Sequence, residues 1–236
     1  GRNTVDKDAD GNHKPMTIRF AEITNAGDII NEVELDASVC DCCQTSITNT
    51  DKGPLVVYRD RSKEEVRDIY ATRNIDNKWE TPAPVHNDGW VIYGCPVNGP
   101  KVVSDSNNIA VSWFTVYEGK PRVNLSFSES YGSSFGAPIQ INDHNAIGRV
   151  DVVYLNDKEV LVSYMEDDDY DTYLRLKKVS IDGKVSNPIT ISKIDSGRNT
   201  GVPQLEILND EIFIVWTVFE NENNQLKTVK LSSKDI

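Results

Sequence analysis

Four apolar segments of this chain repeat one another at a nearly constant spacing, and this repeat limits the folds that the chain can adopt. The segments cover residues 54–61, 108–116, 159–167 and 211–219. Each contains an aromatic residue followed by a polar break, and the spacings between Tyr58, Trp113, Tyr164 and Trp216 are 55, 51 and 52 residues. A period of about 50 residues built only from strand-like segments is typical of propeller blades.

The residues around these segments predict an all-β fold. Val, Ile, Leu and Phe alternate with polar residues, and Asn, Asp, Gly and Pro separate the runs, as expected for strands and turns. We predict a β-propeller whose blades are four-stranded antiparallel sheets. The predicted units are the outer strands of an incomplete blade (1–36), three blades (44–88, 98–143 and 149–192) and an incomplete last blade (202–236). We interpret the chain as the C-terminal part of a larger propeller whose remainder lies upstream of Gly1; a shorter open β-sheet protein is the alternative.

The charge of the chain excludes some classes of partner. With 25 basic and 37 acidic residues the formal charge is −12, so phosphate backbones and anionic membrane surfaces would be repelled. We therefore expect no nucleic-acid partner. No apolar stretch approaches the ~20 residues of a spanning helix, so we expect no transmembrane segment. The chain starts at Gly1 rather than Met, and we interpret it as processed or truncated, so a missing signal peptide does not argue for the cytoplasm.

Two groups of motifs resemble known proteins. The segment SESYGSSF (128–135) is similar to the Asp-box of sialidase-like propellers, with Ser130 where Asp is usual and Phe135 where Trp is common. CDCCQT (40–45), YRDR (58–61), GCPVNGP (94–100) and GRVDV (148–152) resemble a bacterial group labelled sialidase-like or exo-α-sialidase. The resemblance implies a six-bladed propeller, and in such proteins the Asp-box is a structural hairpin away from the active site.

The blade register brings the unusual residues to one face. In propellers the loops entering the first strand of each blade surround the central funnel, and here these loops are CDCCQ, GCPVNGP, GRVD and GRNTGVPQ. We expect an acidic carbohydrate to bind there, because guanidinium groups form paired hydrogen bonds to carboxylates. The predicted ligand-binding residues are Arg59, Arg61, Arg149, Arg198 and, as a stacking platform, Trp90. Structural arginine–aspartate pairs between blades are the alternative.

Hydrolysis of such a ligand would need carboxyl groups. Glycosidases generally use two carboxyls, and sialidases use a tyrosine nucleophile assisted by a carboxylate. The candidate catalytic residues are Asp60, Asp151, Glu166 and Tyr70.

All four cysteines, Cys40, Cys42, Cys43 and Cys95, lie in two consecutive entry loops. In an oxidising compartment this arrangement predicts one or two disulfides that join neighbouring blades, although four cysteines allow three pairings. A soft-metal site for copper or zinc is an alternative, because clustered thiolates favour such ions. Free buried thiols are the third possibility.

A calcium loop is the remaining motif. Asp6, Asp8, Asp10 and Asn12 form the opening of a D-x-D-x-D-G pattern, whose alternate oxygen ligands can surround a hard cation. The position that would carry Glu in an EF-hand is Thr17, so a β-hairpin calcium loop or a solvated acidic turn are the two interpretations.

Together these patterns predict an exported, extracytoplasmic propeller that recognises, or also hydrolyses, an acidic glycan in the funnel. The alternatives are a non-catalytic scaffold that binds a protein partner at the funnel face, and a copper-binding protein that uses the cysteine cluster.

Overall fold

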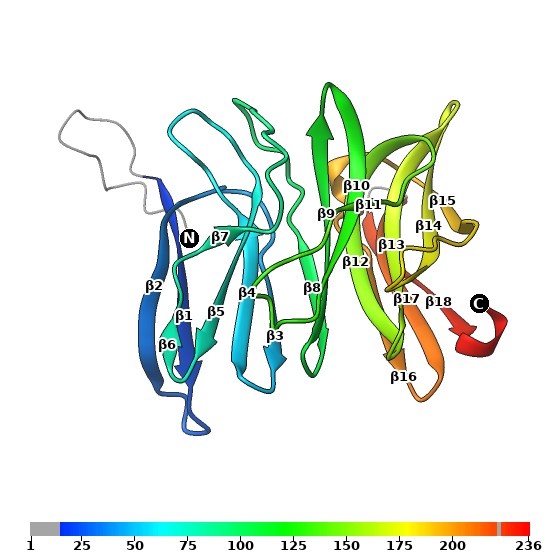
Figure 1. The fold of residues 1–236 in the computed structure, drawn as a ribbon. Helices are drawn as coiled ribbons and strands as arrows, with labels where there is room; N and C mark the ends of the chain where they lie inside the picture. The colour runs from blue at the N-terminus through cyan, green and yellow to red at the C-terminus, as the bar shows by residue number, and fades with distance from the viewer. Residues whose placement is uncertain (1–14, 221–222) are drawn as a thin grey trace.

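The computed structural model describes residues 15–220 and 223–236, and these residues form five antiparallel β-sheets that follow one another along the chain (Figure 1). The first sheet pairs β1 (Met16–Ile23) with β2 (Ile29–Val39). The second contains β3 (Ser46–Thr50), β4 (Gly53–Arg59) and β5 (Ile69–Ile75), with β6 (Lys78–Trp79) and β7 (Ala83–Pro84) both paired to β5.

The next three sheets repeat one simple order of strands. The third contains β8 (Lys101–Asp105), β9 (Asn108–Tyr117), β10 (Lys120–Ser128) and β11 (Ile139–Gln140). The fourth contains β12 (Asn145–Asn156), β13 (Glu159–Asp168), β14 (Asp171–Ser180) and β15 (Ile189–Ile194). The fifth contains β16 (Gln204–Leu208), β17 (Glu211–Glu220) and β18 (Asn223–Ser232). Two short 3-10 helices, η1 (Arg198–Thr200) and η2 (Ser233–Asp235), complete the described elements. The predicted all-β fold of antiparallel, four-stranded sheets is confirmed.

The repeated apolar segments become the second strands of their sheets, β4, β9, β13 and β17. In β13 the side chains of Val160, Val162 and Tyr164 pack into the core shared with the third sheet. Leu161 and Met165 on the other face pack into the core shared with the fifth sheet. Because successive side chains of a strand point to opposite faces, a strand covered by sheets on both sides must be apolar along its whole length.

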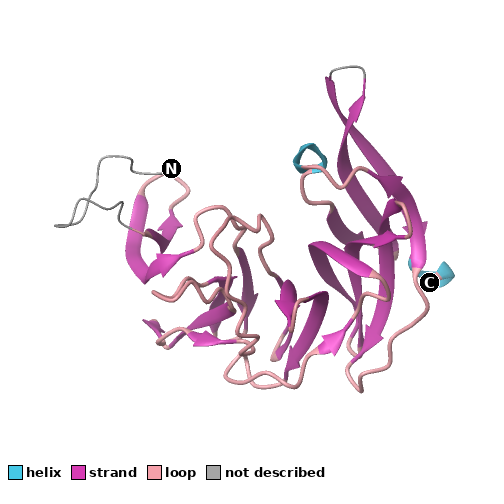
Figure 2. Cartoon of the chain, turned by 90° about the horizontal axis from the view of Figure 1, so that it is seen from above, coloured by secondary structure: helices cyan, strands magenta, loops and turns pink. Residues whose placement is uncertain are grey.

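The first strands of the sheets lie side by side. The Ser46 hydroxyl on β3 accepts a hydrogen bond from the Val102 N–H on β8 at 3.2 Å. Asp151 on β12 likewise accepts from the Leu205 N–H on β16 at 2.9 Å. A cavity of about 450 Å³ lies among the strands β8, β12 and β16 and the start of β3. Figure 2 shows the sheets placed along an arc that leaves one side open.

The segment that resembles an Asp-box connects β10 to β11. The Ser128 hydroxyl accepts hydrogen bonds from the backbone N–H groups of Ser130 and Gly132 at 3.3 and 3.1 Å. Gly132 has a φ of +76°, and a Cβ there would clash with the side chain of Leu55. Phe135 packs against the core that contains Leu55. The turn therefore joins the second and third sheets through packing.

Within the described residues, no helix has the length and apolar character needed to cross a bilayer.

Candidate functional site

The four segments predicted as entry loops, near the starts of β3, β8, β12 and β16, contact one another. The Gln44 amide oxygen accepts from the Gly99 N–H at 3.0 Å, which joins the first loop to the second. Asn98 of the second loop accepts from the Arg149 N–H at 2.8 Å and donates to the Ile147 carbonyl at 3.0 Å. The predicted third entry loop, GRVD, lies within β12 (Asn145–Asn156) rather than before it, at an irregular point of the strand. It reaches the fourth loop, because Arg149 Nη2 donates to the Ser196 carbonyl at 2.9 Å. These four segments, which are far apart in the sequence, therefore contact one another in turn.

Glycine permits two of these close approaches. A Cβ on Gly99 would clash with the backbone of Gln44. Gly148 has a φ of +90°, and a Cβ there would lie 2.6 Å from the Asn98 side-chain oxygen and 2.8 Å from Phe114 Cβ. Any larger residue at either position would separate neighbouring loops.

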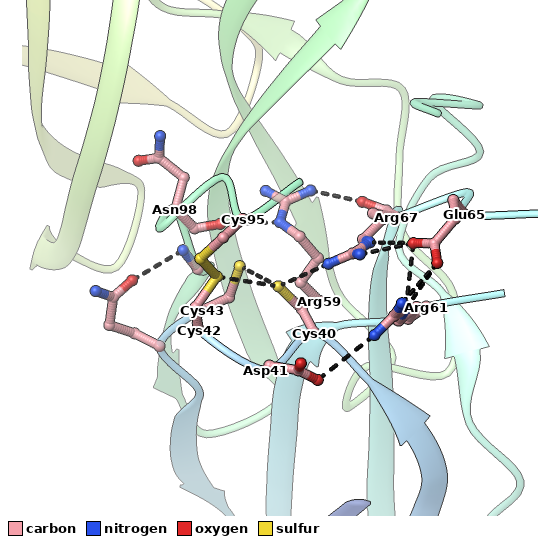
Figure 3. Close-up of a disulfide and its surroundings, with 12 residues drawn as sticks. Cys40, Asp41, Cys42, Cys43, Arg59, Arg61, Glu65, Arg67, Cys95 and Asn98 are labelled. Carbon is pink, nitrogen blue, oxygen red and sulfur yellow. Dashed lines mark hydrogen bonds and ion pairs between the residues drawn. A yellow bond between two sulfur atoms is a disulfide. The ribbon is translucent and has the colours of Figure 1, made fainter. Parts of the chain in front are cut away.

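The cysteines form one cluster at the meeting point of the first two loops (Figure 3). A disulfide joins Cys42 to Cys95, 53 residues apart in sequence. The predicted disulfide between two entry loops is therefore confirmed. Cys40 and Cys43 are free thiols whose Sγ atoms lie 2.7 Å apart, and Cys40 Sγ lies 3.8 Å from Cys42 Sγ.

The two free thiols differ in their surroundings. The hydrogen bond with the Cys43 thiol lowers the pKa of Cys40 to about 5, opposed by burial and assisted by the Cys42 backbone and Arg67. Arg67 Nη1 donates to Cys40 Sγ at 3.5 Å. The same hydrogen bond and burial raise the pKa of Cys43. The arrangement favours a thiolate at Cys40 and a protonated thiol at Cys43.

A pocket of about 680 Å³ opens beside the disulfide. Its lining includes Cys42, Cys95, Met16, Asp41, Arg61, Glu65, Arg67, Tyr93 and Gly94. Glu65 pairs with both arginines, at 2.6 Å from Arg61 Nη2 and 2.6 Å from Arg67 Nη2. Tyr93 is 86% exposed and offers an aromatic surface at this pocket. Glu65, Arg67 and Tyr93 are not among the site residues predicted from the sequence, although the mixed charges of residues 61–68 are a signal for the first two.

Arg59 occupies a different environment from the one predicted. It is only 1% exposed, and its guanidinium donates to the backbone carbonyls of Asn98, Arg67 and Phe114 at 2.9, 2.6 and 2.6 Å. It also stacks over the Trp90 ring at 4.9 Å. Trp90 is 9% exposed and packs edge-on against Phe114. The structure gives both residues a role beneath the cysteine loop: the Arg59 guanidinium is bound by three backbone carbonyls, and the Trp90 ring supports it.

Arg149 retains an unused hydrogen-bonding group. Its Nη1 is buried and has no hydrogen-bond partner among the described residues, whereas Nη2 is paired with the Ser196 carbonyl. Burial lowers the pKa of Arg149, opposed by the nearby charge of Asp195 and assisted by that of Arg198. Arg198 is exposed at the start of η1. Its charge acts on Arg149, so these two of the four predicted arginines lie close together.

Two of the predicted catalytic carboxylates are already bound by the protein. Glu166 has no exposed surface, pairs with Arg175 at 2.6 Å and accepts from the backbone N–H groups of Asp143 and His144 at 2.9 Å each. The Asp151 carboxylate accepts from the Val152 and Leu205 N–H groups and lies 3.5 Å from Lys101 Nζ. These contacts place Glu166 in the core of the fourth sheet and Asp151 between the first strands of two sheets.

Asp60 and Tyr70 lie together between the first and second sheets. Burial is the main cause that raises the pKa of Tyr70, and the charges of Asp60, Asp68 and Asp36 raise it further. The neighbouring Tyr58 hydroxyl donates to Asp36 at 2.6 Å. Neither Asp60 nor Tyr70 lines the pocket beside the disulfide.

The surroundings of Asp60 predict a pH-dependent effect on stability. Burial raises its pKa from 3.8 to about 6, so the folded chain holds a proton that the unfolded chain releases between these values. Stability therefore falls as the pH rises from about 4 to about 6. We expect Asp60→Asn to remove this loss and to stabilise the protein by about 1 to 2 kcal/mol at pH 8, since the group is only half-buried.

Urea unfolding of the wild type and Asp60→Asn at pH 4 and pH 8 measures this effect. The difference between the variant and the wild type is expected to be smaller at pH 4, where Asp60 is protonated in the folded chain and partly protonated in the unfolded chain. An equal difference between the two proteins at both pH values would show that the carboxylate charge is not the cause.

The metal predictions fall into two groups. Asp6, Asp8, Asp10 and Asn12, the proposed calcium ligands, lie outside the described residues. In the described part of the chain, Cys40, Cys42 and Cys43 place three ligand atoms within 4.8 Å of one another. Because Cys42 is bonded to Cys95, a copper or zinc ion would need this disulfide to be reduced first. Both metal sites stay predictions.

Comparison with known proteins identifies the architecture. No protein-family model and no curated protein matches the chain. Among solved structures, the catalytic domain of a GH62 α-L-arabinofuranosidase from Coprinopsis cinerea superposes with a TM-score of 0.51 at 11% identity, over 81% of this chain and 65% of that one. An exo-β-1,3-galactanase from Clostridium thermocellum superposes with a TM-score of 0.52 at 14% identity, over 91% of this chain and 49% of that one.

An endo-arabinase from Bacteroides thetaiotaomicron gives a TM-score of 0.52 at 14% identity, over 80% of this chain and 75% of that one. The chain thus spans about half to two thirds of the length of the first two neighbours. At such identities the likeness is one of fold. The sheets of this chain are arranged as the blades of a β-propeller of the kind found in glycoside hydrolases.

Proposed function

We propose that the face formed by the entry loops binds a carbohydrate that carries a carboxylate, and that Arg149 and Arg198 hold that group. The observation that carries this proposal is the buried Arg149 Nη1, which has no hydrogen-bond partner among the described residues. An unpaired buried donor costs about 1 to 3 kcal/mol. We infer that the Arg149 side chain turns toward a ligand carboxylate and recovers that cost through a charge-assisted hydrogen bond.

The solved neighbours support the choice of ligand class. Their names describe an arabinofuranosidase, a galactanase and an arabinase, so propellers of this shape carry carbohydrate sites. Tyr93 adds an exposed aromatic face near the entry loops, and the side chain of Arg61, which lines the same pocket, is 30% exposed. The resemblance to sialidase-like proteins points to the same ligand class.

We infer recognition rather than hydrolysis as the function. Glu166 and Asp151, two of the carboxylates that the sequence offered for catalysis, are held by internal hydrogen bonds. Asp60 and Tyr70 lie between other sheets than those that carry Arg149. The disulfide between Cys42 and Cys95 supports a location outside the cytoplasm, because such bonds persist in oxidising compartments.

Calorimetric binding with a panel of saccharides tests the proposal. The panel contains oligosaccharides of galacturonic, glucuronic and N-acetylneuraminic acid, and matched neutral oligosaccharides of galactose and arabinose. We expect the protein to prefer an acidic member, and Arg149→Gln to weaken that binding by about 10-fold or more, because a hydrogen bond to a charged group contributes about 1.5 to 3 kcal/mol.

Arg19→Gln is the matched control, since Arg19 lies on β1 and pairs with Glu32 and Glu34 at the surface. Its affinity is expected to equal that of the wild type. Preference for neutral saccharides, or equal losses in both variants, would contradict the role of Arg149. No binding to any saccharide would favour the alternative of a protein-binding scaffold. Release of reducing ends from a bound saccharide would contradict the inference of recognition alone.

A further inference from the structure

The cysteine cluster combines a disulfide at the pocket with two thiols behind it. We propose that the four cysteines form a relay that carries two electrons from the thiol pair Cys40 and Cys43 to the Cys42–Cys95 disulfide, and from there to a disulfide-bearing substrate in the pocket. This activity does not rest on the proposed carbohydrate binding, because Arg149 and Arg198 take no part in it, although Arg61 and Tyr93 line the same pocket.

The distances between the sulfur atoms carry the proposal. Cys40 Sγ lies 3.8 Å from Cys42 Sγ, which is van der Waals contact between a thiol and one sulfur of a disulfide. Cys40 Sγ also lies 2.7 Å from Cys43 Sγ, and the two residues form a C-x-x-C pair. Each sulfur is therefore next to the one with which it would exchange, and no backbone segment has to cross the cluster.

The surroundings of Cys40 favour its role as the nucleophile. The thiolate is the attacking form in thiol–disulfide exchange. The guanidinium of Arg67 donates to Cys40 Sγ at 3.5 Å, and the Cys43 thiol is within hydrogen-bonding distance on the other side. Both contacts stabilise a negative charge on Cys40, in agreement with its lowered pKa. Figure 3 shows Arg67 on the opposite side of Cys40 from the other cysteines.

The exchange is balanced without any further reagent. The Cys40 thiolate attacks Cys42 Sγ, a Cys40–Cys42 bond forms, and Cys95 leaves as a thiolate. Cys43 then loses its proton to the Cys95 thiolate and attacks Cys40 Sγ, which forms the Cys40–Cys43 disulfide and releases Cys42. The dithiol of Cys40 and Cys43 has become a disulfide, and the disulfide at the pocket has become a dithiol.

The substrate then accepts the electrons. The Cys42 thiolate attacks a disulfide R–S–S–R in the pocket and displaces RS⁻, which takes the proton of the Cys95 thiol. Cys95 then resolves the mixed disulfide and displaces the second RS⁻, which takes a proton from solvent. The protein ends with two disulfides, and the substrate is reduced to two thiols. Cys42 and Cys95 line the pocket of about 680 Å³, whereas Cys40 is only 7% exposed. The pocket pair is thus placed to meet the substrate and the inner pair to supply the electrons.

Reaction of the 236-residue protein with glutathione disulfide tests the relay. Under anaerobic conditions the protein, prepared with a single disulfide, is expected to release two equivalents of glutathione. Peptide mapping should then show Cys40–Cys43 and Cys42–Cys95 disulfides. The decisive variant is Cys43→Ser, in which the relay stops after its first step and leaves Cys95 as a thiolate. We expect a glutathione adduct on Cys95, together with a Cys40–Cys42 disulfide.

Cys40→Ser is the matched control, because it removes the nucleophile and leaves the Cys42–Cys95 disulfide in place. It should release no glutathione and carry no adduct on Cys95. A circular dichroism melt of each variant confirms that it is folded. A wild type that releases no glutathione, or an unmodified Cys95 in folded Cys43→Ser, would overturn the proposal. Stoichiometric retention of Cu(I) by the reduced wild type without glutathione turnover would instead identify a soft-metal site.

Discussion

Replacing Arg59 with methionine is expected to lower the free energy of unfolding by about 3 to 5 kcal/mol. The guanidinium is fully buried and donates to three backbone carbonyls, which belong to three different segments: Asn98, Arg67 and Phe114. Methionine fills a similar volume but donates nothing, so these carbonyls would lose their partner away from water. The loop that carries Cys95 would also lose its connection to β4.

Urea unfolding of Arg59→Met measures this loss, with Arg61→Met as the control. Arg61 is two residues away, is 30% exposed and pairs with Glu65 and Asp41 at the rim of the pocket. Its replacement is expected to cost about 1 kcal/mol or less, as for other partly exposed ion pairs. A stable Arg59→Met protein that had lost only carbohydrate binding would restore the ligand-binding role that the sequence predicted.

The second large effect is expected at Glu166. Glu166→Gln should destabilise the protein by about 2 to 3 kcal/mol. It removes the charge that lies 2.6 Å from the buried Arg175, which, within the described part of the structure, then keeps only Asp168 as an ion-pair partner. The same carboxylate receives the N–H groups of Asp143 and His144, so it also fixes the connection between the third and fourth sheets. The Tyr164 hydroxyl also donates to this carboxylate at 3.4 Å, and glutamine has only one acceptor oxygen for the four donors.

Thermal and urea unfolding test this expectation against Glu211→Gln, a change in an exposed pair with Lys230. The control is expected to lose about 0.5 kcal/mol or less. If Glu166 were instead a proton donor to a bound sugar, Glu166→Gln would keep the stability of the wild type and change only turnover. The two roles are therefore separated by the stability measurement alone.

The strands could be predicted because they obey a local rule. Side chains alternate between the faces of a strand, and here both faces are covered, so the sequence carries long apolar runs such as 159–165 that repeat once per blade. The register of the repeat also placed the entry loops on one face. The shared face of the loops could be predicted without knowing any tertiary contact, because the strand order of a four-stranded blade fixes the end of the sheet at which each loop emerges.

The roles of the charged residues could not be predicted in the same way. Arg59 and Arg61 are separated by one residue in sequence, yet one is buried under the cysteine loop and the other is partly exposed in the pocket. The burial of Arg59 depends on carbonyl groups at Asn98 and Phe114, far away along the chain. The residues next to Arg59 in the sequence therefore do not predict that these carbonyls bind its guanidinium.

The sequence by itself determined the all-β repeat, the common face of its loops and the presence of a disulfide between two of them, because spacing and residue type follow from the geometry of one chain segment. The tertiary structure alone decided which cysteines pair, which carboxylates are neutralised and which arginine keeps an unpaired nitrogen. Each of these features depends on the distance between side chains that meet only after the blades pack, and on how far they are removed from water. Neither quantity can be read from a short sequence motif.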